Sequence, residues 1–152
     1  MLSKVIEVLE EELVSLKDQT AREIVEINGR LIRTGAKTKL RLLLKQNGEY
    51  SSFSIIWRKI IYMDWQKHRA RAKYIKKGRS YQVPKSRLMA HCRNCESWEP
   101  EYIWEKELEF ARVREKVDLL SKALLALKHY SLLSAEGRSE EKPDAGNLRT
   151  PR

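Results

Sequence analysis

The chain has 152 residues, with 31 Lys and Arg against 21 Asp and Glu, a formal net charge of +10 and a pI near 9.7. This length fits one domain with an appended helix or tail, and it excludes two independent cores. A hydrophobic fraction of 41% excludes wholesale disorder. No apolar run reaches the roughly 18–20 residues of a transmembrane helix. An acidic N-terminus and only two cysteines indicate a cytoplasmic protein without a signal peptide, a disulfide framework or a membrane partner.

The positive charge is concentrated in residues 58–87. Residues 1–57 have a net charge of +1 and residues 88–152 a net charge of −1, so this block carries the excess of +10. Like charges destabilise a compact chain unless a polyanion relieves their repulsion, which favours a nucleic-acid partner. An acidic protein, a membrane surface or a plain solvated segment are the alternatives. The block contains a single acid, Asp64, and the cations Arg58, Lys59, Lys67, Arg69, Arg71, Lys73, Lys76, Lys77, Arg79, Lys85 and Arg87.

The first predicted element is a helix from Leu2 to about Leu31, because apolar residues recur there at intervals of three and four. Asn28-Gly29 could instead end this helix near Ile27, or form a turn between short strands at 23–27 and 30–33; we prefer the helix. Its stripe could pack against a later helix of the same chain or form the seam of a coiled-coil homodimer. The residues of this stripe are Ile6, Leu9, Leu13, Leu16, Ile24, Ile27 and Leu31.

A β-hairpin is predicted next. The sequence predicts two strands, over residues 37–46 and 49–65, joined by a type I′ turn at Asn47-Gly48. The second strand should present one apolar face, broken only by Lys59. Trp57 is predicted to lie in the core. An isolated hairpin is only marginally stable, so this ribbon must pack on a helix or pair with further strands. The residues of the apolar face are Phe53, Ile55, Trp57, Ile61 and Met63.

Two helices follow the basic block. Pro84 suits the first turn of a short helix over residues 85–96, and Glu99-Pro100 opens a long helix over about 100–133. A broad apolar face predicts that the long helix is buried along much of its length. Residues 135–152 have almost no apolar content and are predicted to be a disordered tail. The apolar face of the long helix comprises Ile103, Phe110, Val113, Val117, Leu120, Leu124 and Leu127, and is widened by Trp104, Leu108, Ala111 and Leu119.

Few residues suggest chemistry. One cluster, His91, Cys92 and Cys95, could supply part of a zinc site or a redox pair. A structural zinc site needs four ligands, and the sequence does not provide a fourth at a suitable spacing. We therefore interpret the three as ordinary helix residues and predict no metal. Tyr62 with Asp64 and His68 could be imagined as a nicking centre, yet such an enzyme needs a histidine cluster that this chain lacks. The acids of EPEYIWEKELEF (residues 99–110) are assigned to a solvated helix face. The sequence predicts neither catalysis nor a cofactor.

The order of the parts resembles the MobI-type family of conjugative mobilisation proteins, over about residues 1–130. The resemblance lies in the N-terminal helix, FSIIWRKI (53–60), the basic KKGRSYQVPKSRL (76–88) and WEPEYIWEKELEFARVREKVDLLSKAL (98–124). It implies a bacterial accessory protein of a mobile genetic element. Such a protein acts at the origin of transfer and helps a separate relaxase and the transfer machinery to start DNA export. No catalytic residue is carried over from the family.

These inferences combine into one hypothesis. The fold should be α+β, with two long helices packed on a small antiparallel ribbon in a single domain, residues 1–134. The function should be non-enzymatic DNA binding in support of conjugative transfer. An RNA-binding or ribosome-associated protein, or a helical adaptor for an acidic partner, are the alternatives. Phosphate contacts are expected from Arg58, Lys59, Lys67, Arg69, Arg71, Lys73, Lys76, Lys77 and Arg79, and stacking on bases from Trp65 and Tyr74.

Overall fold

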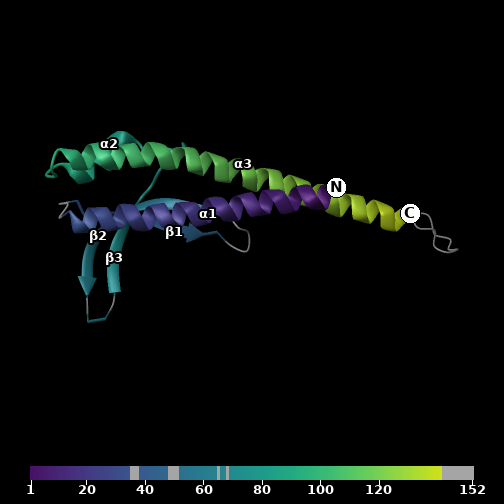
Figure 1. Cartoon of the computed structure of the whole chain (residues 1–152), viewed down its shortest axis with the longest axis horizontal. Coiled ribbons are helices and arrows are strands. Elements are labelled where there is room, and N and C mark those ends of the chain that lie inside the picture. Colours follow the sequence, from purple (N-terminus) through teal and green to yellow (C-terminus); the bar gives the residue numbers. More distant parts are fainter. Residues whose placement is uncertain (35–37, 48–51, 65, 68, 142–152) are drawn as a thin grey trace.

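A computed structural model describes residues 1–34, 38–47, 52–64, 66–67 and 69–141. The fold is α+β, as predicted. Both long helices are present, α1 with 32 residues and α3 with 44. Together they form one layer, and the sheet packs against both of them (Figure 1). In chain order the elements are α1 (Leu2–Arg33), β1 (Leu40–Gln46), β2 (Phe53–Asp64), β3 (Arg69–Ile75), α2 (Lys85–Met89), the 3-10 helix η1 (Ala90–Cys92) and α3 (Trp98–Glu141).

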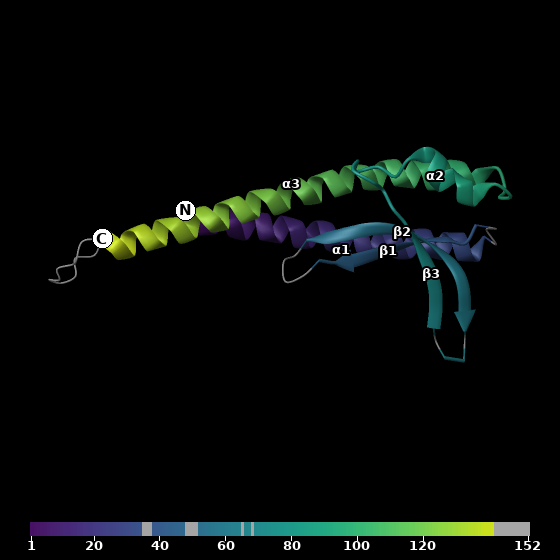
Figure 2. The same ribbon diagram turned by 180° about the vertical axis from the view of Figure 1, so that it is seen from behind.

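The helices α1 and α3 lie side by side and antiparallel, as both views show (Figures 1 and 2). Leu13 is buried between the packed elements, with Leu9 and Leu16 partly buried next to it. An ion pair of 3.5 Å joins Lys128 of α3 to Glu10 of α1. Packing within the chain therefore uses the stripe that could have formed a coiled-coil seam.

Helix α1 continues through Asn28-Gly29, so the prediction of one helix is confirmed. Asn28 bonds with the exposed edge of β1 instead of ending the helix. Its side-chain Nδ2 donates to the Leu42 carbonyl at 2.9 Å, and its Oδ1 accepts from the Leu42 N–H at 2.8 Å. A helix side chain thus satisfies both backbone groups of one residue on an edge strand.

The sheet has the order β1-β2-β3, with both pairs antiparallel. Gln46 pairs with Phe53, and the Asn47 N–H donates to the Ser52 carbonyl at 3.0 Å. The loop is therefore longer than a two-residue type I′ turn, so that prediction was wrong; Gly48 itself lies outside the described residues. The third strand, β3, was not predicted at all.

One face of the sheet carries the core. Phe53, Ile55 and Trp57 are buried there as predicted, and Trp57 is fully inaccessible to solvent. The prediction was wrong for Ile61, which is 56% exposed. The register between β2 and β3 shifts between Ile60 and Tyr62, and such a bulge turns the following side chains out of alternation.

The long helix α3 is less buried than its apolar face predicted. Ile103, Phe110, Val117 and Leu124 are buried, but Leu108 and Leu119 are largely exposed. Trp104 is half-buried, with the Lys85 ammonium 5.5 Å from its ring centre. The helix also continues to Glu141, past the predicted end at residue 133. The remaining part of the predicted tail, residues 142–152, lies outside the described residues.

Helix α2 packs against α3 and is bonded through Arg87 to the backbone just after β3. It begins after Pro84, as predicted, and η1 extends it to Cys92, so it is shorter than the expected 85–96. Leu88 of α2 and Cys92 of η1 are buried in the same core as Trp57. None of the helices within the described residues is long and apolar enough to cross a membrane.

Candidate nucleic-acid interface

The first part of the basic block, residues 58–75, belongs to a β-hairpin that extends past the rest of the sheet. The first residue of β1, Leu40, pairs with Lys59, and the Ile60 N–H donates to the Lys39 carbonyl at 3.0 Å; beyond Ile60, β2 pairs with β3 alone. We call this two-stranded extension, residues 60–72, the β-arm. It points away from the helix pair in both views (Figures 1 and 2). A projecting ribbon of this kind is narrow enough to approach a nucleic-acid groove.

The predicted phosphate-binding cations fall into three places. Arg58 and Lys59 lie on β2, at the root of the β-arm. Lys67 and Arg71 are exposed in the β-arm, and Lys73 is exposed at its root. Lys76, Lys77 and Arg79 lie in the loop after β3, where Lys76 and Arg79 are exposed and Lys77 is half-buried.

Arg69 and Trp65 complete the predicted set. Arg69 lies in β3, where it pairs in the backbone register with Asp64 of β2. Trp65 lies outside the described residues, as does His68 of the imagined nicking centre.

Arg58 and Lys59 point to opposite faces of the sheet, because side chains alternate along a strand. Arg58 is opposite Arg41 of β1 and Tyr74 of β3, on the face turned away from the helices. Tyr74 is 51% exposed, so it is not a core anchor, and its ring is accessible for stacking. Lys59 is opposite Lys73 on the face that carries α2 and η1. The predicted cations thus occupy two faces and a loop.

The loop after β3 is fixed to α3 by a buried polar network. Arg114 makes a bidentate ion pair with Glu107, with N–O distances of 2.8 and 2.9 Å. Arg114 also donates to the Tyr81 carbonyl at 2.7 Å and to the Ile55 carbonyl at 3.1 Å. Through these bonds α3 holds both the beginning of β2 and the loop that carries Lys76, Lys77 and Arg79.

Glu107 accepts two further hydrogen bonds, from Trp57 Nε1 at 2.9 Å and from the Val83 N–H at 2.6 Å. Glu107 and Glu99 are both fully buried, so the prediction that these acids lie on a solvated face was wrong for them. Sequence reasoning missed the network because charge balance along a helix does not say which side a charge faces. The one signal in the sequence was the spacing of Glu107 and Arg114, because residues seven positions apart, about two helical turns, lie on the same face of a helix.

A second contact fixes the loop nearer the surface. The Tyr81 hydroxyl donates to Asp118 of α3 at 2.5 Å, and Lys122 pairs with the same carboxylate at 2.9 Å. These two bonds lower the pKa of Asp118, and the hydrogen bond to Asp118 raises the pKa of Tyr81. An open groove of about 880 Å³ lies beside this contact, between the loop, the beginning of β2 and α3.

The His91, Cys92 and Cys95 cluster has structural contacts. Cys92 shares side-chain hydrogen bonds with Thr38 and Cys95, and Cys95 with Glu99. Burial, and then the bond to Glu99, raise the pKa of the Cys95 thiol to about 12. Such a thiol stays protonated at neutral pH and is a poor nucleophile, because the thiolate is the reactive form. Among the described residues, no group of three or more His, Cys, Asp or Glu side chains is placed to hold a metal ion.

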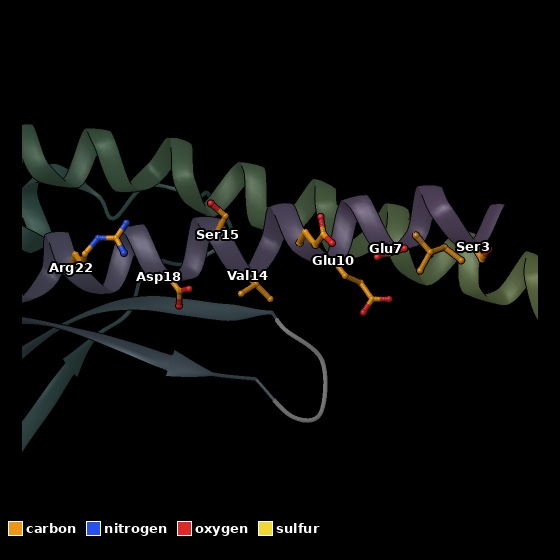
Figure 3. A pocket seen from close by; sticks show the side chains of 9 residues that line it. Ser3, Glu7, Glu10, Val14, Ser15, Asp18 and Arg22 are labelled. Atoms are coloured by element: carbon orange, nitrogen blue, oxygen red, sulfur yellow. The ribbon is translucent and has the colours of Figure 1, made fainter. Parts of the chain in front are cut away.

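The outer face of α1 has the opposite charge. Its hollow of about 590 Å³ is lined by Glu7, Glu10, Glu11 and Asp18, with Arg22 at one end. Figure 3 shows these side chains spaced along this single helix. Clustered carboxylates repel phosphate, so this surface is unsuited to nucleic acid.

Comparison with known proteins identifies the family of this chain. The model of the MobI protein family matches residues 9–128, which include the sheet, the β-arm, α2 and most of both long helices. No curated protein and no solved structure matches the chain significantly. Because the matched segment is well over half of the chain, the protein belongs to the MobI family.

Proposed function

We propose that this protein is a non-enzymatic DNA-binding accessory protein that supports the start of conjugative DNA transfer. Membership of the MobI family supports the role in mobilisation. The relaxase and the transfer machinery are the protein partners that this role would require. The observation that carries the DNA-binding part is the position of the charge: the block with a net charge of +10 forms the β-arm, its root and the adjoining loops.

The shape of the β-arm fits this proposal. The major groove of duplex DNA admits a two-stranded β-ribbon, and several DNA-binding proteins insert strands into a groove. Cations at the root of the ribbon and in the loop would meet the phosphates on either side. Such contacts fix the position of a protein on DNA without reading its sequence. Exposed Tyr74 is placed at the root, where it can contact the sugar–phosphate edge or an unpaired base.

The buried polar side chains support a binding role rather than catalysis. Glu107 and Arg114 bond to each other and to the backbone, and Glu99 bonds to Thr38 and Cys95. Each of these groups thus has a structural partner. A nucleophile or general base has to reach a substrate, and these side chains are enclosed.

The test is a triple substitution, Lys73→Ala/Lys76→Ala/Lys77→Ala. We expect this variant to bind all duplexes more weakly, and by about the same factor. The slope of log affinity against log salt concentration should fall in magnitude by about 2–3, because each phosphate contact contributes about 0.9 to it. Fluorescent duplex, single-stranded DNA and structured RNA are titrated at two salt concentrations. The wild type should favour duplex, with a slope of roughly −4 to −7 for about 5–8 neutralised phosphates.

The matched control is Arg22→Ala/Arg112→Ala/Lys116→Ala, which removes three exposed charges from the two long helices. Its salt slope should equal that of the wild type. If both triple variants lower affinity equally, net charge alone drives binding and the proposed interface is wrong. A clear preference for structured RNA would replace the DNA-binding proposal with the RNA-binding one.

A further inference from the structure

The root of the β-arm carries two adjoining hollows on the face covered by α2 and η1. One, of about 470 Å³, opens between β1, β2 and the segment after η1. The other, of about 330 Å³, opens between the end of β3 and α2. His91 of η1 lines both, so the two hollows meet at this residue. The second hollow shares Tyr74, Ile75 and Lys76 with the groove along α3, but Asp118 of that groove lines neither hollow.

Every charged side chain that lines these hollows is a cation, among the residues that the structure describes. The first hollow has Lys39, Lys59 and Arg93; the second has Lys73, Lys76 and Arg87. Lys59 and Lys73 are direct cross-strand partners, an arrangement of like charges that destabilises a sheet. Burial, followed by the charges of Lys59 and Lys73, lowers the pKa of His91. The repulsion is built into the sheet, and an anion bound between these side chains would relieve it.

We propose that these two hollows form a paired phosphate site, which holds neighbouring backbone phosphates of the DNA that the β-arm engages. This inference rests on the proposed function and extends the interface to four residues outside the predicted set: Lys39, Arg87, His91 and Arg93. Phosphates on one DNA strand repeat every 3.4 Å along the helix axis, so two adjoining sites can hold neighbouring groups of a strand.

The geometry of Arg87 favours this ligand. One guanidinium nitrogen donates to the Lys76 carbonyl at 2.6 Å, which fixes α2 to the end of β3. The remaining N–H groups of a guanidinium form a planar fork that suits phosphate oxygens. A phosphate therefore meets a donor that is already oriented, with lysines on both sides.

The first experiment needs no variant. The ring resonances of the histidines are followed by heteronuclear NMR while inorganic phosphate replaces chloride at constant ionic strength and pH. His91 should shift in a saturable way, and exposed His129 on α3 should not. A short duplex should then shift His91 in the same direction and displace the phosphate. Equal shifts of His91 and His129 would mean general screening and would overturn the proposal.

The second experiment measures the salt slope of duplex binding for Lys39→Gln/Arg87→Gln/Arg93→Gln. Its slope should be smaller than that of the wild type by about 2–3. Arg87→Lys, which retains the charge, should keep the wild-type slope, and Arg22→Ala/Arg112→Ala/Lys116→Ala serves again as the matched control. Circular dichroism of each variant establishes that it is folded.

The outcomes separate the two proposals. If Lys73→Ala/Lys76→Ala/Lys77→Ala flattens the slope but Lys39→Gln/Arg87→Gln/Arg93→Gln does not, the paired phosphate site is wrong and DNA binding by the basic block stands. If the wild type binds no DNA, the proposed function fails. A saturable His91 shift with phosphate in that case would show an anion site for another ligand, which also overturns the assignment to a DNA backbone.

Discussion

At the scale of single residues, the ion pair of Glu107 and Arg114 decides how α3 meets the sheet. Both side chains are almost completely buried, and between them they make six hydrogen bonds. A buried pair adds little stability over apolar residues of the same shape, because two charges must leave water. Removal of one partner is different, since it leaves the other charge buried and uncompensated.

We therefore predict that Arg114→Met lowers the free energy of unfolding by about 3–5 kcal/mol. Urea denaturation followed by tryptophan fluorescence measures this change, and Trp57 reports on the site because it donates to Glu107. The double variant Glu107→Leu/Arg114→Met should be more stable than Arg114→Met alone. A control is Glu109→Gln, whose side chain is 50% exposed and which should change stability by less than about 0.5 kcal/mol. A small loss for Arg114→Met would mean that water reaches Glu107.

At the scale of elements, sequence periodicity predicted the two long helices and the first two strands. Buried Phe53, Ile55 and Trp57 alternate along β2 as their pattern indicated. The third strand was missed because RARAKYI begins by alternating cations with alanines, and over the part of it whose side chains are described, residues 71–75, Ile75 alone is buried. Its pairing is set by β2, which is a tertiary effect that a local pattern does not contain. The candidate cations were identified from composition, but their division between two faces depends on β3 and the bulge.

The Asn28 side chain of α1 hydrogen-bonds to the edge strand of the sheet. As part of α1 it supplies both a donor and an acceptor to Leu42 of the edge strand β1. We predict that Asn28→Ala lowers the free energy of unfolding by about 1–3 kcal/mol, the cost of leaving partly buried polar groups unpaired. Hydrogen exchange should also speed up at the Leu42 amide while the Trp57 amide in the central strand stays protected.

Asn28→Asp separates the two bonds. A carboxylate still accepts from the Leu42 N–H but cannot donate to its carbonyl. Exchange at the Leu42 amide should therefore stay slow in Asn28→Asp, with stability between that of the wild type and Asn28→Ala. If Asn28→Ala exchanged at the wild-type rate, the edge of β1 would be held by the packing of α1 alone.

At the scale of the whole molecule, charge is separated along the helix pair. The β-arm projects near one end, whereas the acidic face of α1 lies toward the N-terminus (Figures 1 and 3). The screening length at physiological ionic strength is about 8 Å, so distant charges of opposite sign offset the β-arm very little. Repulsion among the cations at the root of the β-arm, including paired Lys59 and Lys73, is therefore largely uncompensated in the absence of DNA.

This separation predicts that sodium chloride stabilises the DNA-free protein. Raising the salt from low to physiological ionic strength should increase the free energy of unfolding by about 1 kcal/mol, which for a chain of this size is about 2–4 °C in the melting temperature. Thermal unfolding followed by circular dichroism measures it. The Lys73→Ala/Lys76→Ala/Lys77→Ala variant should gain less from salt, because fewer cations repel one another. A melting temperature that falls with added salt would instead mean that attractive surface pairs, such as Lys128 with Glu10, dominate the field of the molecule.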